Sequence, residues 1–555
     1  MRYIFENIEK RQEKVKKILL ICCIAFIFGA CGNNNGGDAG LAATAEASET
    51  GLPWDITGEL TIMGWSGDGV YYRDAGRSGI DPASVSGTGT VAAAFIATAE
   101  AFNQLFPNVI INVYAQEAGP YANDISWSQH RENFAMEHGY ADIFYIVDLA
   151  EEMSRGLVGD ISIFSNTQSY RAFNPELMQH MNFNGRQLGL PETIIPWGVF
   201  VNKSLADANN IDIPDPDWTF EEYLSFINHS SPNEFYGAMG VYWDIINTGT
   251  NSIERQIQNR GPDDPFVTLN TQEVRDMLAL TNRQLGHTIW PQYDRGNIAG
   301  EFMDENWWWG WRFFTQGSLL TLDGDPWMML SGGTEGSSNF VVASNWDVYP
   351  RPSTQHAPLH VSAFPDPMSV RNFAMDDGNP ELNDEELLKL KLAYEFLAFH
   401  ITDPRAWQAR ADYRFGEYGE PALNFTFPST TGELFDEQMA IWFEVHPDRF
   451  GDPNQMPGFH KVIELWQEGQ LVFNIDRTFP IHHEFEGSRR QIMHEWNRKW
   501  AEDAVGADYS NPNWLDMVYA RLPEWDALFD ARWREVFVDI DNSLARFYPV
   551  LTPIS

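Results

Sequence analysis

Apolar positions follow two different periods along the first third of the chain, and the two periods alternate. Three short apolar runs bounded by turn residues have the pattern of buried strands: 59–63, 109–113 and 141–147. Two intervening segments, 91–106 and 126–138, are predicted as helices, the first because its apolar side chains recur at helical spacing. Strands that alternate with helices in this way predict an α/β layer with parallel strand pairing.

A different pattern occupies residues 183–205, FNGRQLGLPETIIPWGVFVNKSL, which form an extended apolar segment with Trp197 where apolar residues meet polar ones. Pro191 and Pro196 donate no hydrogen bond to a sheet ladder. We therefore predict that this segment does not lie in the middle of one sheet but passes between two bodies. Residues 199–201 are predicted as one more short strand, and a helix is expected to start at 202–204.

The remaining chain is predicted to be richer in helices than in strands. The helices are expected at 217–227, 271–285, 307–317, 384–400, 489–500 and 525–537. Extended segments are expected at 319–322 and 346–352. Trp218-Thr219 before Phe220 has the pattern of a helix cap. No internal repeat is evident, which disfavours a solenoid or a propeller.

Length and charge narrow the class of protein. A chain of 555 residues is too long for one hydrophobic core, so two or more lobes are expected. The net charge of -41 repels phosphate backbones and argues against nucleic-acid binding. Because 43% of the residues are hydrophobic, the acidic surface is not a sign of disorder.

All three cysteines lie near the N-terminus. An apolar run at 18–28 follows three lysines and precedes Gly29-Ala30-Cys31, the pattern of a secretory signal. Residues 28–31 resemble a bacterial lipobox, which implies a lipid on Cys31. Residues 1–31 are therefore expected to be a lipoprotein signal peptide, with translation starting at Met1 or Val15, and 32–57 a flexible tether. The body lacks cysteine and must fold without disulfides.

Several segments, in order, resemble the extracellular solute-binding proteins of the carbohydrate class, the receptors of ABC importers. They are Phe102 to Val109, Ala141-Asp142-Ile143, Leu190 to Lys203, Trp218 to Glu222, Phe314 to Trp327 and Ala393 to Asp403. The resemblance implies an α/β fold of type II with two discontinuous lobes joined by hinge strands. Lobe 1 would comprise 58–182 plus 326–402, and lobe 2 would comprise 183–325 plus 403–555.

The same resemblance implies a function and a location. The chain would be a non-enzymatic, monomeric receptor that captures a carbohydrate, expected to be an oligosaccharide, and delivers it to ABC permease subunits. It would be held to the cell membrane by its lipid, facing the extracellular side or the periplasm. A polyol or a peptide remains an alternative ligand. A glycan-degrading surface enzyme and an adhesive or scaffolding lipoprotein are the alternative functions.

Sugars stack on aromatic rings and exchange hydrogen bonds with planar polar groups, so a cleft that pairs Trp with polar side chains suits them. The loop after the first predicted strand should lie on the ligand side, since ligands gather beyond the carboxyl ends of parallel strands. The ligand-binding candidates are Trp65, Asp68, Trp197, Trp243, Trp308, Asp325 and Trp327. The resemblance adds Glu484, Phe485 and Arg489. For each Trp, packing in the core is the alternative.

Catalytic and metal signatures are incomplete. Residues 64–68 are one glycine short of a nucleophile elbow, and His483-Glu484 and His494-Glu495 lack the second histidine of a zinc helix. The acidic loop 376–381 is a candidate for Ca²⁺, although it lacks EF-hand spacing and a solvated loop is the alternative. We therefore predict no catalytic residue and no required cofactor.

Overall fold

The computed structural model describes a defined part of the chain. The described residues are 48–65, 69–85, 90–116, 127–147, 149–231, 234–239, 264–265, 268, 270–284, 287–289, 313–314, 316–324, 345–376, 378–416, 419–423, 426–446, 448–473 and 514–553. Residues 47–555 form one compact unit.

The strands are β1 (Gly58–Trp65), β2 (Val70–Tyr72), β3 (Val109–Gln116), β4 (Ile143–Tyr145), β5 (Asn182–Phe183), β6 (Arg186–Gln187), β7 (Leu190–Asn202), β8 (Thr321–Gly324), β9 (Trp346–Tyr349), β10 (Val361–Val370), β11 (Arg414–Phe415), β12 (Glu420–Pro421) and β13 (Leu471–Phe473). The α-helices are α2 (Thr90–Leu105), α4 (Trp127–His138), α5 (Leu149–Ser154), α6 (Gln168–Ala172), α7 (Pro175–Gln179), α8 (Lys203–Ala208), α9 (Phe220–Ile227), α12 (Gln272–Gln284), α17 (Asp384–Thr402), α18 (Pro404–Asp412), α19 (Gly432–Val445), α20 (Pro457–Gln467) and α22 (Trp514–Phe547).

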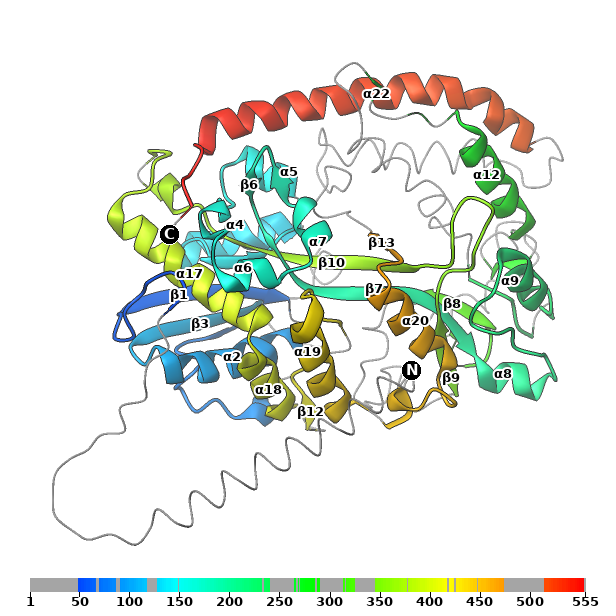
Figure 1. Ribbon diagram of the computed structural model, residues 1–555, viewed down its shortest axis with the longest axis horizontal. Coiled ribbons are helices and arrows are strands. Elements are labelled where there is room, and N and C mark those ends of the chain that lie inside the picture. Colours follow the sequence, from blue (N-terminus) through cyan, green and yellow to red (C-terminus); the bar gives the residue numbers. More distant parts are fainter. Residues whose placement is uncertain are drawn as a thin grey trace, which may run out of the picture. The chain divides into compact units, whose positions relative to one another are not determined.

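Among the described residues, nine strands form one sheet in the order β2-β3-β1-β4-β10-β7-β8, with β13 beside β10 and β9 beside β7. β1 pairs in parallel with β3 and β4, which confirms the predicted parallel layer. β10 runs antiparallel to both β4 and β7. β7 and β10 are therefore the long strands that connect the parallel group to β8 and β9 (Figure 1).

The parallel strands are buried on both faces, as strands with helices on either side are expected to be. Ile62 and Ile111 pack on one face against α2 and α17, in a cluster that also holds Phe102 and Leu397. Met63, next to Ile62, belongs to a second cluster on the other face. Because successive side chains of a strand point to opposite faces, these two layers follow from the sequence pattern.

The helix starts are set by local sequence. Thr219 caps α9 and Asn383 caps α17, each with a complete capping box that satisfies backbone N–H groups at the helix start. The helices predicted at 91–106, 126–138, 217–227, 271–285 and 384–400 are confirmed, and 525–537 lies within α22. Most of 307–317 and all of 489–500 lie outside the described residues.

The prediction that Pro191 and Pro196 keep residues 183–205 out of a sheet interior is wrong. β7 is one strand, bordered by β10 on one side and by a bridge to Phe427 on the other. The N–H and carbonyl of Ile194 both bond Phe427, so they point away from β10.

Successive residues of a strand point their N–H and carbonyl groups to alternate sides, and this alternation explains why β7 and β10 tolerate proline. Ile194 is opposite Pro365, and because Ile194 points its polar groups elsewhere, this pair exchanges no ladder hydrogen bond. Pro365 therefore needs no N–H toward β7. Pro196 is two residues beyond Ile194, so its nitrogen also faces away from β10. Pro196 and Pro365 thus occupy positions whose missing donors the β7–β10 pairing does not use.

Candidate functional site

The carboxyl ends of β1, β3 and β4 meet at one edge of the sheet, where ligands of α/β proteins gather. Trp65 is the last residue of β1, and its Cα pairs with that of Gln116, the last residue of β3. The backbone of Trp65 therefore lies at this edge, as the last residue of β1 and not in the loop expected after the predicted strand 59–63. Gln116 is a polar side chain at the same edge that sequence reasoning missed, although its place at the end of an apolar strand run was a usable signal.

The second part of the candidate site lies on the β7–β10 pair. Trp197 of β7 pairs with Ser362 of β10. Gly198 follows and is in close contact with β9: a Cβ there would lie 2.6 Å from Cγ2 of Val348 and 2.7 Å from the carbonyl oxygen of Tyr349. A glycine next to Trp197 is therefore needed for β9 to approach β7 this closely.

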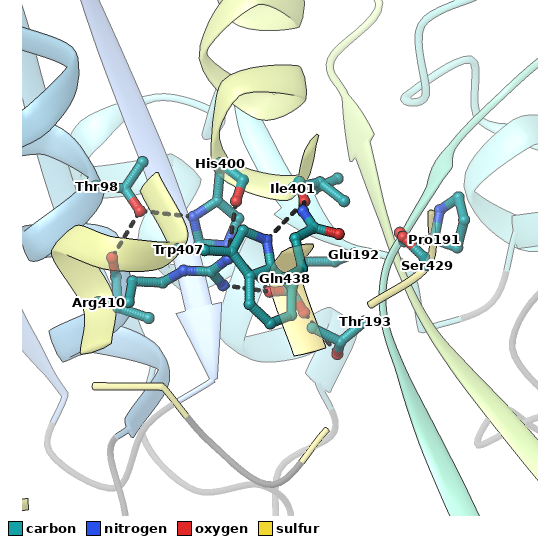
Figure 2. Close-up of polar contacts among 11 residues, drawn as sticks. Thr98, Pro191, Glu192, Thr193, His400, Ile401, Trp407, Arg410, Ser429 and Gln438 are labelled. Carbon is teal, nitrogen blue, oxygen red and sulfur yellow. Dashed lines mark hydrogen bonds and ion pairs between the residues drawn. The ribbon is translucent and has the colours of Figure 1, made fainter. Parts of the chain in front are cut away.

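A buried polar cluster holds the start of β7 (Figure 2). Oε1 of Glu192 on β7 lies 3.0 Å from Nε2 of His400 on α17. Nδ1 of His400 lies 2.8 Å from the hydroxyl of Thr98 on α2. Thr193 donates a hydrogen bond of 2.9 Å to Glu192, and a guanidinium nitrogen of Arg410 on α18 lies 3.9 Å from it. The carboxylate of Glu192 therefore ties β7 to α17 and α18 directly, and to α2 through His400.

The electrostatics of this cluster indicate an ionised Glu192 beside a neutral His400. Burial by itself would raise the pKa of Glu192, but the hydrogen bond from His400 and the positive charge of Arg410 lower that pKa. Burial lowers the pKa of His400 to about 4, and the nearby charge of Arg410 acts in the same direction. His400 therefore donates from Nε2 to Glu192, while its Nδ1 is in hydrogen-bond contact with the hydroxyl of Thr98.

Further hydrogen bonds extend the attachment to the end of α17, as Figure 2 shows. The indole of Trp407 and the side-chain amide of Gln438 on α19 each donate a hydrogen bond of 2.8 Å to the carbonyl of Ile401. Ser429 donates to the carbonyl of Pro191 on β7. The first residues of β7 are thus fixed to the helices that cover the parallel strands.

Sequence reasoning did not find this cluster. Glu192 stood out as a charged residue between prolines in an apolar run, which is the available signal, but its partners lie far along the chain. Of the predicted ligand-binding residues, Trp65 and Trp197 have a described backbone and their side chains are not described. The others lie outside the described residues: Asp68, Trp243, Trp308, Asp325, Trp327, Glu484, Phe485 and Arg489.

The predicted lipid site and part of the predicted Ca²⁺ loop also fall on residues that the structure does not describe. Cys31 lies outside the described residues, as does Asp377 of the acidic loop. Within the described ranges, no group of three or more His, Cys, Asp or Glu side chains is arranged to hold a metal ion. Nor does any helix in this part of the chain have the length and apolar character needed to cross a bilayer.

Comparisons with known proteins identify the fold. No family model matches the chain. No curated protein matches it by sequence. The solved structures give clear matches. A periplasmic solute binding protein, ECA2210 from Pectobacterium atrosepticum, is 13% identical with a TM-score of 0.52, over 86% of this chain and 100% of that one.

Two further structures agree. The ABC substrate-binding protein Lmo0181 from Listeria monocytogenes, solved in complex with cycloalternan, is 14% identical with a TM-score of 0.51, over 88% of this chain and 99% of that one. A family 1 extracellular solute-binding protein from Bifidobacterium longum subsp. infantis is 11% identical with a TM-score of 0.50, over 86% and 99% of the two chains. The chain therefore has the α/β fold of solute-binding proteins, which confirms the predicted fold class.

Proposed function

We propose that this chain is a non-enzymatic receptor that captures a carbohydrate, an oligosaccharide in particular, and delivers it to an ABC importer. The observation that carries the proposal is the antiparallel β7–β10 pair, which links the parallel strands to β8 and β9 in a chain with the fold of solute-binding proteins. Sequence motifs and fold point to the same class. Lmo0181, which has a similar fold, was solved with a cyclic oligosaccharide bound.

The proposed mechanism is closure of two lobes around the ligand, with β7 and β10 as the hinge. A ligand that contacts both lobes only in the closed form stabilises that form by its difference in affinity. The proposed lobes comprise 58–182 plus 326–402 and 183–325 plus 403–555, and two contacts join these two sets of residues. α18, from the second set, packs on α2, and β9, from the first set, pairs with the carboxyl half of β7.

The proposed ligand contacts combine rings with polar groups. Trp65 at the sheet edge and Trp197 on the hinge strand are the aromatic platforms that have a described backbone. The proposal keeps the other predicted contacts: Asp68, Trp243, Trp308, Asp325, Trp327, Glu484, Phe485 and Arg489.

We further propose that Cys31 carries a lipid that holds the receptor on the outer side of the cell membrane. The support is the signal-like apolar run and the lipobox-like sequence before it. In cells fed a labelled fatty acid, the wild-type chain should take up label and sediment with membranes. Cys31→Ser should do neither, and equal labelling of the two would contradict the proposed anchor.

The binding function is tested by a thermal-shift screen of the full-length chain, since a ligand that binds only the folded state raises the unfolding midpoint. The screen should include neutral and acidic oligosaccharides, a polyol, amino acids and short peptides, with chromatography of each glycan after incubation. A raised midpoint with intact glycan supports the receptor. Hydrolysis products would favour the enzyme alternative, and an unchanged midpoint with every oligosaccharide would refute the proposed ligand class.

A further inference from the structure

Among the described residues, two buried hydrogen-bond donors lie near the carboxyl edge of the parallel strands without an acceptor. The side chain of Gln116, at the end of β3, is 2% exposed, and its Nε2 has no hydrogen-bond partner among the residues that the structure describes. One terminal guanidinium nitrogen of Arg131, Nη2, is likewise buried without a partner in the described ranges. Folded proteins rarely leave buried donors unused, so this pair requires an explanation.

The packing of α4 on β3 places Gln116 and Arg131 at the same end of the parallel strands. Tyr114 of β3 stacks on Phe134 of α4 with ring centroids 4.4 Å apart. α4 connects two strands of one parallel group, so it runs back along β3. Gln116 lies two residues beyond Tyr114 on the strand, and Arg131 lies about one turn before Phe134 on the helix. Both steps lead toward the carboxyl edge.

The charge of Arg131 is already balanced. Its guanidinium forms an ion pair with Glu152 of α5, and the two side chains are 11% and 6% exposed. The same Glu152 oxygen accepts the backbone N–H of Val147, just beyond β4, at 3.2 Å. The guanidinium also lies over the ring of Phe144, 5.2 Å from its centroid. Arg131 is thus held in place, and with Glu152 it offers a hydrogen-bond donor without a net charge.

We propose that Gln116 and Arg131 donate hydrogen bonds to oxygen atoms of an uncharged glycan, an inference that rests on the proposed function and makes its ligand class more specific. A hydroxyl or ring oxygen accepts such bonds without adding charge. A carboxylate or a sulfate would add negative charge beside buried Glu152, in a chain whose net charge is -41. The site therefore favours neutral saccharides over uronic acids or sulfated sugars.

The decisive variant is Gln116→Leu, which replaces an unused buried amide with an apolar group of similar size. If Nε2 of Gln116 bonds only to the ligand, Gln116→Leu should leave the melting temperature of the free chain unchanged or higher, because that nitrogen has no internal hydrogen bond to lose. Affinity for the bound glycan should fall about tenfold, the usual effect of losing one hydrogen bond. Arg131→Lys keeps the charge opposite Glu152 but removes the planar pair of donors, and should weaken binding similarly.

The measurements are calorimetric titrations and melting curves of the full-length chain with maltotetraose, cellotetraose, xylotetraose and tetragalacturonate. Gln272→Leu, on an exposed position of α12, is the matched control and should bind as the wild type does. Wild-type binding of a neutral tetrasaccharide that Gln116→Leu weakens supports the inference. Equal binding by the two, a lower melting temperature of the free variant, or a preference for tetragalacturonate would overturn it and leave the receptor function standing. Binding of none of the glycans by the wild type would instead refute the receptor function.

Discussion

Nε2 of His400 lies 3.0 Å from Oε1 of Glu192, although the two residues are separated by 208 positions in the chain. His400 belongs to α17, which covers the parallel strands, whereas Glu192 lies near the start of β7, the proposed hinge strand. The contact fixes the first residues of β7 to the parallel group. We therefore expect any bending of β7 to occur beyond Thr193, toward Trp197 and Gly198.

Replacing Glu192 should destabilise the folded chain strongly. Glu192→Gln keeps the shape of the side chain but leaves the buried guanidinium of Arg410, which is 3% exposed, without its carboxylate. Breaking a buried charge pair in this way costs about 3 kcal/mol. Urea unfolding should show this loss for Glu192→Gln, while Glu385→Gln at the exposed start of α17 should change stability by only about 0.5 kcal/mol.

A double variant tests the cause. If the loss in Glu192→Gln reflects the unpaired guanidinium, adding Arg410→Met should recover part of the stability, because the isolated charge is then gone. Strictly additive effects of the two changes would show that the pair does not interact energetically, and that packing alone explains the loss.

The pH dependence of stability should carry the signature of His400. Its pKa is lowered by burial to about 4 in the folded chain, against an ordinary value of 6.5. Between these values the unfolded chain binds the proton and the folded chain does not, so acid favours unfolding. The free energy of unfolding contributed by His400 should be constant above pH 6.5 and decrease by up to about 3 kcal/mol as the pH falls to 4.

His400→Gln removes the titrating group and keeps one donor and one acceptor. Chemical unfolding at several pH values should give a shallower decrease for this variant than for the wild type. Some decrease should remain, since burial also lowers the pKa of His180 to about 4 and the lowered pKa of Glu192 acts in the same direction at lower pH. Parallel curves for the two chains would mean that His400 does not titrate in this range.

The α/β core was predictable because its signals are local. The period of the apolar residues predicted β1, α2, β3 and α17, and the capping residue Thr219 indicated the start of α9. The behaviour of β7 was not predictable, since a proline is harmful or harmless according to which side of the strand its nitrogen faces. That parity depends on Phe427 and Pro365, which pair with Ile194 from distant segments.

The candidate site was predictable only in part, for a related reason. Trp65 could be placed at a strand end from the βαβ pattern, and Trp197 from its position in an extended apolar run. Glu192 was visible as a charge in an apolar segment, but nothing in its neighbourhood indicates His400 or Arg410 as its partners. Gln116 can be proposed as a ligand contact only when the structure shows that it is buried and that its Nε2 has no partner among the described residues.

Gly198→Ala should destabilise the chain through a steric conflict. The added Cβ would lie 2.6 Å from Val348 Cγ2 and 2.7 Å from the carbonyl oxygen of Tyr349, so β9 must shift. Overpacking of this kind costs about 1–3 kcal/mol. Urea unfolding should reveal the loss, with Gly451→Ala as a control because nothing lies within 4 Å of the added Cβ there. Equal stability of the two variants would show that β9 yields without cost.

The final prediction concerns Trp197 as an aromatic platform for the ligand. If its ring stacks on a sugar, Trp197→Ala should weaken binding of the glycan found in the thermal-shift screen by about tenfold to a hundredfold, since an aromatic stacking contact is lost together with its buried area. The melting temperature of the free chain should remain nearly unchanged. A ring that packs in the core would give the opposite result, because removing a buried Trp costs about 3–5 kcal/mol and lowers the melting temperature.

The matched control for this substitution is Trp54→Ala, because Trp54 is 59% exposed and lies outside the strands of the sheet. It should change neither affinity nor melting temperature by much. A large loss of affinity in Trp197→Ala with intact stability would place the ligand against β7, beyond the point where Glu192 fixes this strand. The ligand would then contact the part of the hinge strand that is expected to bend. Unchanged affinity would remove Trp197 from the site and with it the argument that the ligand lies on the hinge.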